Sequence, residues 1–391
     1  MIASSREIAL FDFISHETMH LPFNEEYLRL VRAAFPHGRI IFRARAGHVA
    51  NLAPRVADLD GISFESCEPF TVPFGLSKHN PLGARLAAHG CRRVMADAVK
   101  GRSMQLATLL GVEGSLYAVV GERWPAISDA PLHMVLHGQL GDAMIWRPRN
   151  PLARAMDIVS QIQQPLPKGV SVVALELGVQ EAIAEIAPRN RSVITLEHPI
   201  LTSEWSEAKL PAADGPLKIA FLGNARRSKG FEVFVRLTQS ASDREDLVFE
   251  SIGIAASDTD DLDVSALRRK PSRTSMPRRE YVDAVKAIDL VCLPMHSRAY
   301  DFTASGTLAD AVSALKPLVA FRNRTFDAIV SRYGPIGWLV ESEAELFYLI
   351  QTLDRRTFAD ARSEWVENLR KIRDARRPEA LAAGYATLLA S

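Results

Sequence analysis

A loop of glycine and basic residues lies between an apolar run and a helical pattern in the second half of the chain, with the sequence FLGNARRSKGF at residues 221–231. Gly223 permits a tight turn at the carboxyl end of a strand, where doubly wound sheets bind their ligands. The loop then supplies three positive charges, those of Arg226, Arg227 and Lys229. Arginine suits paired hydrogen bonds to phosphate oxygens, and lysine adds a point charge. The loop therefore predicts phosphate binding, with an ordinary basic turn that ends at Gly230 as the alternative.

A second motif, YDFTASGTLADA at residues 300–311, follows a short apolar run and opens a helical pattern. Ser305 or Thr303 can cap this helix through its hydroxyl. A diphosphate is expected at the positive helix end, held by three backbone N–H groups, those of Ser305, Gly306 and Thr307. Asp310 lies about one turn further along, where a carboxylate can accept hydrogen bonds from the two hydroxyls of a ribose. An ordinary capped helix is the alternative.

Short apolar runs alternate with helical patterns in both halves of the chain, which is typical of βαβ units. The strands expected in the first half are IALFDFI, RIIFRA, SLYAVVG, HMVLHG, VSVVALE and SVITLEH. Those expected in the second half are LKIAFLG, LVFESIG, DLVCLP and KPLVAF. Short strands that are apolar throughout indicate a parallel sheet covered by helices on both faces. We therefore expect an α/β fold with two Rossmann-like, doubly wound parallel-sheet domains.

The chain of 391 residues is longer than one ordinary domain. Residues 1–200 are expected to form an N-terminal Rossmann-like domain. The following segment, residues 201–216, is polar, contains two prolines and is the expected linker. Residues 217–368 would form the C-terminal Rossmann-like domain. Residues 369–391 are helical in pattern and are expected to cross back to the first domain.

The two motifs resemble those of the GT-B glycosyltransferases, above all the retaining family four. That family has a glycine, then an arginine, then Lys-Gly six and seven positions after the glycine. Three residues match this spacing, Gly223, Lys229 and Gly230. Asn224 stands in the place of the arginine, so the resemblance puts Asn224 at the diphosphate, with Arg226 or Arg227 reaching it from a shifted position.

A later pattern of the same family, an acidic residue and alanine followed by Gly-x-Pro-Val-Val, is similar to residues 310–319. Asp310 replaces a glutamate in this pattern, and Phe302 stands in the place of the family's first glutamate. The backbone of residues 305–307 would supply the contacts of that missing carboxylate.

The resemblance implies a GT-B fold whose two domains face a cleft, with the donor on the C-terminal domain and the acceptor on the N-terminal domain. The donor would be a nucleoside-diphosphate sugar, and the acceptor a saccharide or glycan hydroxyl, free or lipid-linked. A hexosyl transfer of this kind, as in polysaccharide biosynthesis, would proceed without metal and with retention of configuration. Neither a cofactor nor a metal ion is expected.

Two candidates for catalysis lie in the first half of the chain. His137 ends one of the expected strands, and in the resembled enzymes a histidine at such a strand end contacts the donor sugar beside the reacting carbon. A polar residue on the sheet rim is the alternative. Glu17 follows the first strand and would accept the acceptor's hydroxyl proton, a general-base role worth ~10²–10⁴-fold. A retaining enzyme needs no protein base, because the departing phosphate can take that proton.

The loop that holds Glu17, SHETMHLPFN at residues 15–24, also carries two imidazoles and an amide. In the resembled fold it faces the acceptor, which would place His16, His20 and Asn24 against that substrate. His16 is a second candidate for the base. A solvent loop whose Asn24 caps the next helix is the alternative.

The formal net charge of +1 gives the chain no bias toward nucleic acid, which we exclude as a partner. Three scattered cysteines predict neither disulfides nor zinc. No apolar run reaches the ~20 residues of a transmembrane helix, and the first residues lack the pattern of a signal peptide. We expect a cytoplasmic protein, with peripheral binding at the inner membrane surface as an alternative. Four residues would form the basic helix face for such binding: Arg92, Arg93, Lys100 and Arg102.

An acidic run, Asp258-Thr259-Asp260-Asp261, resembles the metal-binding triplet of the other major glycosyltransferase fold. It follows an expected strand at a distance from the phosphate motifs, so a solvated loop is expected. Two other functions share the predicted fold: a nucleotide-sugar epimerase and a non-catalytic protein that binds a sugar nucleotide. A dinucleotide oxidoreductase is disfavoured, because no Gly-x-Gly-x-x-Gly follows either opening strand.

Overall fold

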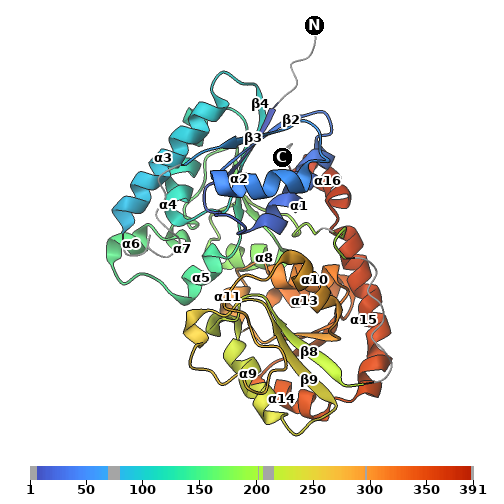
Figure 1. Ribbon diagram of the computed structural model, residues 1–391. Helices are drawn as coiled ribbons and strands as arrows, with labels where there is room; N and C mark the ends of the chain where they lie inside the picture. The colour runs from blue at the N-terminus through green and yellow to red at the C-terminus, as the bar shows by residue number, and fades with distance from the viewer. Residues whose placement is uncertain (1–6, 69–79, 201, 206–214, 296, 389–391) are drawn as a thin grey trace. The chain divides into compact units, whose positions relative to one another are not determined.

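The computed structural model describes residues 7–68, 80–200, 202–205, 215–295 and 297–388. The chain divides into two compact units, whose elements Figure 1 labels. Unit 1 comprises Met1–Pro199, Asp301–Ala304 and Arg376–Ser391, and unit 2 comprises Ile200–Tyr300 and Ser305–Ala375. The expected boundary at residue 368 therefore falls inside a helix of unit 2, and a four-residue segment of the second half belongs to unit 1.

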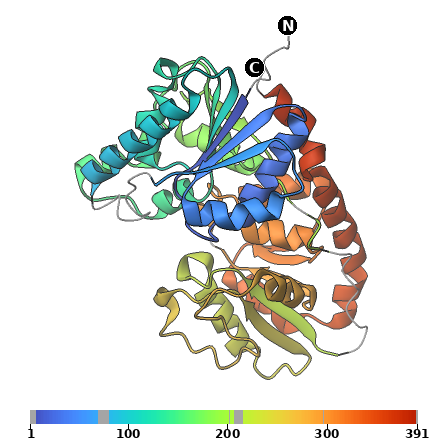
Figure 2. The same cartoon turned by 45° about the horizontal axis from the view of Figure 1, so that its top comes forward.

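The core of unit 1 is a parallel seven-stranded sheet in the order β3-β2-β1-β4-β5-β6-β7, seen from a second side in Figure 2. Its strands are β1 (Glu7–Asp12), β2 (Arg39–Ala44), β3 (Ile62–Ser66), β4 (Met104–Leu110), β5 (Leu132–Leu136), β6 (Val170–Ala174) and β7 (Val193–Thr195). Along β1, Leu10 and Phe11 point to opposite faces and enter different apolar clusters. Both faces of the sheet are therefore covered, which makes the unit doubly wound.

The helices of unit 1 are α1 (Leu21–Ala34), α2 (Ala46–Leu52), α3 (Pro81–Val99), α4 (Gly114–Leu116), α5 (Gln139–Ile145), α6 (Pro151–Ala155), α7 (Ile158–Gln161), α8 (Leu177–Ile186) and α16 (Pro378–Thr387). The face of Phe11 packs against α3, α4, α7 and α8. The face of Leu10 packs against α1 and α16.

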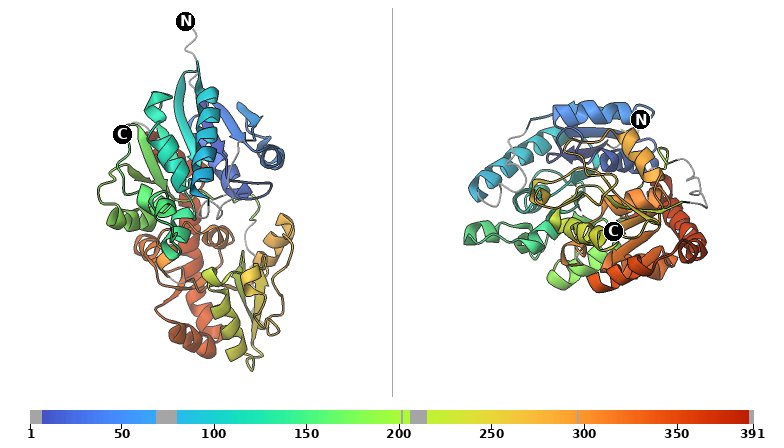
Figure 3. Two further views of the ribbon diagram at one scale, coloured as in Figure 1. Left: turned by 90° about the vertical axis from the view of Figure 1, so that its left-hand side faces the viewer. Right: turned by 60° about the horizontal axis from the view of Figure 1, so that its bottom comes forward.

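Unit 2 contains a parallel five-stranded sheet in the order β12-β11-β10-β8-β9. Its strands are β8 (Leu217–Leu222), β9 (Leu247–Ile252), β10 (Leu290–Leu293), β11 (Leu318–Phe321) and β12 (Gly337–Val340). Its helices are α9 (Phe231–Ser240), α10 (Arg278–Lys286), α11 (Ser297–Tyr300), α12 (Gly306–Ser313), α13 (Arg324–Tyr333), α14 (Glu343–Thr352) and α15 (Arg355–Ala375). One face packs against α9 and α14 and the other against α10, α12 and α13 (Figure 3). The prediction of two doubly wound parallel sheets is confirmed.

One strand prediction is wrong. The run SLYAVVG at residues 115–121 forms α4 and a π-helical turn, Tyr117–Gly121, while β4 lies earlier in the chain. Leu116, Tyr117 and Val120 are all buried in the core beside the sheet. A buried helical turn and a buried strand are equally apolar over seven residues, so periodicity cannot separate them.

The C-terminal helix α16 is joined to unit 1 by polar contacts inside its core. Arg376, which precedes α16, donates from Nη1 and Nη2 to the two carboxylate oxygens of Glu176, each at 2.8 Å. Both side chains are almost fully buried, with 1% and 5% of their areas exposed. The hydroxyls of Tyr27 and Tyr385 share a hydrogen bond of 2.7 Å. These contacts place α16 against α1.

Within the described residues, no helix is long and apolar enough to cross a lipid bilayer. Cys67, Cys91 and Cys292 carry free thiols, the first partly buried and the other two buried.

A buried histidine of β5 makes the stability of unit 1 depend on pH. His133 is 2% exposed, and burial lowers its pKa to about 4. The unfolded chain takes up this proton near pH 6.5, well above the pKa in the folded state, so stability falls as the pH drops below about 6.5. The free energy of unfolding of the parent protein should fall between pH 7 and pH 5. Replacing His133 by leucine should make this fall about 2 kcal/mol smaller, as measured by urea unfolding at both pH values.

The matched control for this experiment is His37→Leu, since His37 lies in an exposed turn. That variant should keep the pH dependence of the parent protein. An unchanged pH dependence in His133→Leu would contradict the assignment of His133 as a neutral core residue.

Candidate active site

In unit 2, the loop after β8 packs directly against the start of α12. Gly223 has a φ of +85°, and a Cβ atom on it would lie 3.2 Å from Thr307 Oγ1. On its other side, a Cβ atom on Gly253 would lie 1.9 Å from the carbonyl oxygen of Gly223. A larger residue at 223 would meet both steric crowding and backbone strain. The structure thus brings the two predicted phosphate motifs together at Gly223 and Thr307.

The far end of the loop is fixed by Gly230. Its φ is +76°, and a Cβ atom there would lie 1.8 Å from the carbonyl oxygen of Pro294. Since only glycine fits this close approach, the chain turns into α9 directly beside the end of β10. The basic loop is therefore held at both ends by backbone contacts.

The first turn of α12 presents unpaired backbone donors. Ser305 is the N-cap, and its Oγ accepts from the N–H of Leu308 at 3.2 Å. The N–H groups of Gly306 and Thr307 find no hydrogen-bond partner within the part of the chain that the structure describes. Gly306 is exposed, with open space around it. A helix start of this kind favours an anion.

The three basic residues of the loop differ in their exposure and in their contacts. Arg226 is exposed and forms no ion pair with a described residue. Arg227 is bound by acids, since Nη2 donates to both oxygens of Asp261 at 2.8 and 2.6 Å and Nη1 lies 2.8 Å from Glu232. The contact of Arg227 with the diphosphate stays a prediction, and it would require the guanidinium to exchange these exposed ion pairs. Lys229 is half-buried in the turn before Gly230.

The acidic run after β9 contacts two arginines, Arg227 and Arg273. Asp258 accepts from the backbone N–H of Arg227 at 3.2 Å, and Asp260 pairs with Arg273. In the described ranges, no group of three or more His, Cys, Asp or Glu side chains is arranged to hold a metal ion.

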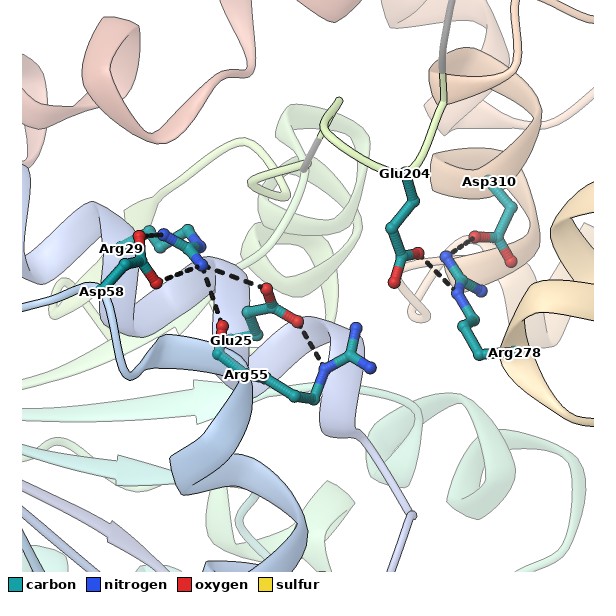
Figure 4. A network of polar contacts seen from close by, with 7 residues as sticks. All are labelled: Glu25, Arg29, Arg55, Asp58, Glu204, Arg278 and Asp310. Atoms are coloured by element: carbon teal, nitrogen blue, oxygen red, sulfur yellow. Dashed lines mark hydrogen bonds and ion pairs between the residues drawn. The ribbon is translucent and has the colours of Figure 1, made fainter.

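Asp310 belongs to a half-buried polar network that the sequence did not reveal (Figure 4). Its two carboxylate oxygens accept from Arg278 Nη2 at 3.2 Å and from the Tyr281 hydroxyl at 2.9 Å. Arg278 also donates to Glu204 at 2.7 Å and lies over the ring of Trp205, 5.4 Å from its centroid. Burial raises the pKa of the Asp310 carboxyl, and Arg278 opposes this effect. The contact of Asp310 with a ribose stays a prediction. The ribose hydroxyls would have to donate to the lone pairs of the carboxylate that Arg278 and Tyr281 leave unused.

Phe302 and Asn224 are the two positions that depart from the pattern of the resembled family. Phe302 is buried in the apolar core of unit 1, so no carboxylate is presented there. Asn224 has a buried Oδ1 with no hydrogen-bond partner among the described residues. An orphaned acceptor of this kind is rare in folded proteins.

In unit 1, His137 follows β5 and lies in a cluster of aromatic rings. The ring of His20 stacks on it, with centroids 4.8 Å apart and planes at 10°. The ring of Phe23 lies nearly perpendicular to that of His137, with centroids 4.1 Å apart, and its centroid lies 5.1 Å from that of the His198 ring. Burial, followed by His20 and His198, holds the pKa of His137 well below its usual range. His137 is therefore a neutral imidazole, able to donate or accept a hydrogen bond without carrying charge.

The loop after β1 is fixed by a buried network. Asp12 Oδ1 accepts from the N–H groups of Ile14 and Ser15 at 3.0 and 2.9 Å. Its Oδ2 accepts from Asn24 Nδ2 at 2.6 Å, and the same Nδ2 lies 2.8 Å from His48 Nε2. Asn24 is fully buried inside α1, so it neither caps this helix nor faces solvent. Its predicted contact with the acceptor is corrected to the positioning of this loop.

The same loop holds two residues in the left-handed region, Glu17 with φ 43° and His20 with φ 56°. Such strain costs roughly 1–3 kcal/mol per residue and is concentrated at functional sites. The Glu17 side chain packs against Gly47 at the start of α2 and accepts from Asn51 at 3.3 Å. Glu17 and His16 are exposed, and their roles as base stay predictions.

Sequence reasoning missed several residues of these sites: Phe23, His48, His198, Arg278 and Tyr281. Of these, Phe23 alone lay within a predicted motif, since it precedes Asn24 in the loop of residues 15–24. The others lie far along the chain from the motifs that they support, and only the fold brings them there.

No family model matches this sequence, and no curated protein sequence matches it. Solved structures do match over nearly the whole chain. The HepE protein of Anabaena, in complex with UDP, has a TM-score of 0.62 at 14% identity, covering 98% of this chain and 99% of its own. A glycosyltransferase from Rickettsia africae has a TM-score of 0.63 at 10% identity, covering 98% of both chains.

The E. coli trehalose-6-phosphate protein, bound with UDP-2-fluoro glucose, has a TM-score of 0.64 at 8% identity, with 98% of this chain and 99% of its own covered. Identities this low carry the fold alone. The chain therefore has the GT-B fold of these glycosyltransferases, which confirms the resemblance at the level of architecture.

Proposed function

We propose that this protein is a glycosyltransferase that moves a sugar from a nucleoside-diphosphate sugar to a hydroxyl of a saccharide or glycan. The observation that carries the proposal is the contact between Gly223 and Thr307 in unit 2, which joins the basic loop to the start of α12. Ligands of doubly wound sheets bind at the carboxyl ends of strands, where this contact lies.

The diphosphate would bind at the first turn of α12. The N–H groups of Gly306 and Thr307 would donate to its oxygens, and Arg226 and Lys229 would supply positive charge. These groups can stabilise a leaving diphosphate without a metal ion, because preorganised donors act where charge develops. Uridine diphosphate is the first nucleotide to test, since two of the matching structures hold UDP or a UDP sugar.

In unit 1, His137 would contact the donor sugar as a neutral hydrogen-bonding group. With retention of configuration, the departing phosphate takes the proton of the acceptor hydroxyl, and no protein base is needed. Glu17 or His16 would be the base in an inverting reaction. The acceptor would be held by the strained loop after β1, with His20 beside His137.

A thermal-shift screen of nucleoside diphosphates and their sugars tests the proposal. Ligand at 100 times its Kd stabilises the folded state by about 2.7 kcal/mol, which raises the melting temperature by several degrees. The best sugar nucleotide is then incubated with saccharide acceptors, and nucleotide release is measured. Failure of every nucleoside diphosphate to raise the melting temperature would contradict the proposal.

A second candidate is a protein that binds the sugar nucleotide without turnover. The burial of Phe302 in place of an acidic residue favours it, because a family carboxylate is absent there. Binding in the screen without release of nucleotide on any acceptor would support this candidate. An epimerase would instead convert the donor sugar with no acceptor added, which product analysis detects.

A further inference from the structure

Helix α3 of unit 1 carries apolar side chains on the face that points away from the core. Its inner face is buried and consists of Ala84, Ala87, Ala88, Cys91, Met95, Ala98 and Val99. Leu82 and Leu86, one turn apart on the opposite face, are 63% and 69% exposed. Exposed leucines at neighbouring positions leave an apolar stripe without a partner within the described chain.

Three further exposed apolar side chains belong to the same unit: Ile145, Trp146 and Leu152. They come from the end of α5, the residue after it and α6. Pro81, Trp146 and Ala153 line one pocket, which brings the start of α3 beside α5 and α6. Most of the exposed large apolar residues of the described chain therefore come from α3, α6 and the end of α5, three neighbouring elements of unit 1.

The same face of α3 is basic. Arg85 and Arg93 are exposed on the side of Leu82 and Leu86, by the 3.6-residue repeat. The sole acidic residue of the helix is Asp97, near its end. His89 lies between the two arginines, and its pKa is lowered by burial and then by the nearby positive charges of Arg92, Arg85, Arg123 and Arg93. Apolar and cationic groups thus share one surface on a chain whose net charge is only +1.

We propose that unit 1 docks on an anionic lipid bilayer through this surface, the α3 face, defined as Leu82, Arg85, Leu86, Arg93, Ile145, Trp146 and Leu152. Leucine and tryptophan side chains enter the boundary between headgroups and acyl chains, while arginines reach the lipid phosphates. A symmetric dimer through the same face is disfavoured, because both copies would bring the same arginine-bearing face to the interface, where like charges would meet. The surface lies wholly in unit 1, so this inference does not rest on the proposed function.

Sedimentation with lipid vesicles tests the proposal. The full chain should bind vesicles that contain phosphatidylglycerol, and raised salt should weaken this binding. Leu82→Ser/Leu86→Ser should lower the partition coefficient at least about tenfold. Arg85→Ser/Arg93→Ser should lower the partition coefficient on anionic vesicles by about fivefold per arginine. The same variant should bind neutral phosphatidylcholine vesicles as the parent does. Tryptophan emission should shift to the blue on binding, and Trp146→Phe should abolish most of the shift.

The matched control is Tyr348→Ser, which removes an apolar side chain that is 70% exposed on α14 of unit 2. It should bind vesicles like the parent. Either of two results overturns the proposal: no binding of the parent chain to anionic vesicles, or equal binding by the double leucine variant. If the parent chain were a dimer in solution and the double leucine variant a monomer, the surface would be assigned to a second copy instead. The nucleotide screen contains no lipid, so the two proposals fail separately.

Discussion

Replacing Arg376 by methionine should cost about 3–5 kcal/mol of the free energy of unfolding, the largest loss that we expect from a single substitution. The variant leaves the carboxylate of Glu176 buried without its partner. Burial already raises the pKa of Glu176, and Arg376 opposes that rise. Without the arginine the pKa rises further, so the loss should shrink as the pH falls toward the unfolded value of about 4.3. Urea unfolding at pH 7 and pH 5 measures both effects.

The companion variant, Glu176→Leu/Arg376→Met, removes both charges and should recover most of the lost stability, because an apolar pair can replace a buried ion pair. Arg370→Met is the control, since Arg370 pairs with Glu367 at the surface and should cost less than about 1 kcal/mol. If Arg376→Met were no more costly than Arg370→Met, the buried pair would not hold α16 to unit 1.

Replacing Lys229 by alanine should lower kcat/KM for the sugar nucleotide by about 10²–10³-fold, because the lysine stabilises charge that develops on the leaving diphosphate. The melting temperature without ligand should change little. Lys270→Ala is the control, as an exposed lysine of the same unit that lies after β9. Release of nucleotide from the donor measures the rate. An unchanged kcat/KM in Lys229→Ala would remove this residue from the site.

The fold was predictable because most strands of both sheets are short and largely apolar, as in β10 and β11. This pattern requires cover on both faces of a sheet. The same logic failed at residues 115–121, where the apolar side chains are buried by a helical turn. Local composition reports burial, and it does not always report backbone conformation.

The candidate site was predictable where its chemistry is local in sequence. Gly223, Gly230 and Ser305 have the turn and cap roles that their residue types favour. The sequence could not show that Arg227 forms an ion pair with Asp261, because the fold determines which charged residues lie side by side. The burial of Asn24 likewise depends on His48, a residue of another helix.

The measurement that tests the central claim most directly is calorimetric titration of UDP into the parent chain, Gly306→Val and Gly384→Val. Gly306 has open space where its Cβ would lie, so the valine should fold normally while blocking the approach of a phosphate to the start of α12. Gly384 in α16 has the same open space and serves as the control. We predict that the parent and Gly384→Val bind UDP equally and that Gly306→Val binds at least about tenfold more weakly, a difference of about 1.4 kcal/mol. Absence of binding by the parent, or equal affinity in all three proteins, would contradict a diphosphate site at α12.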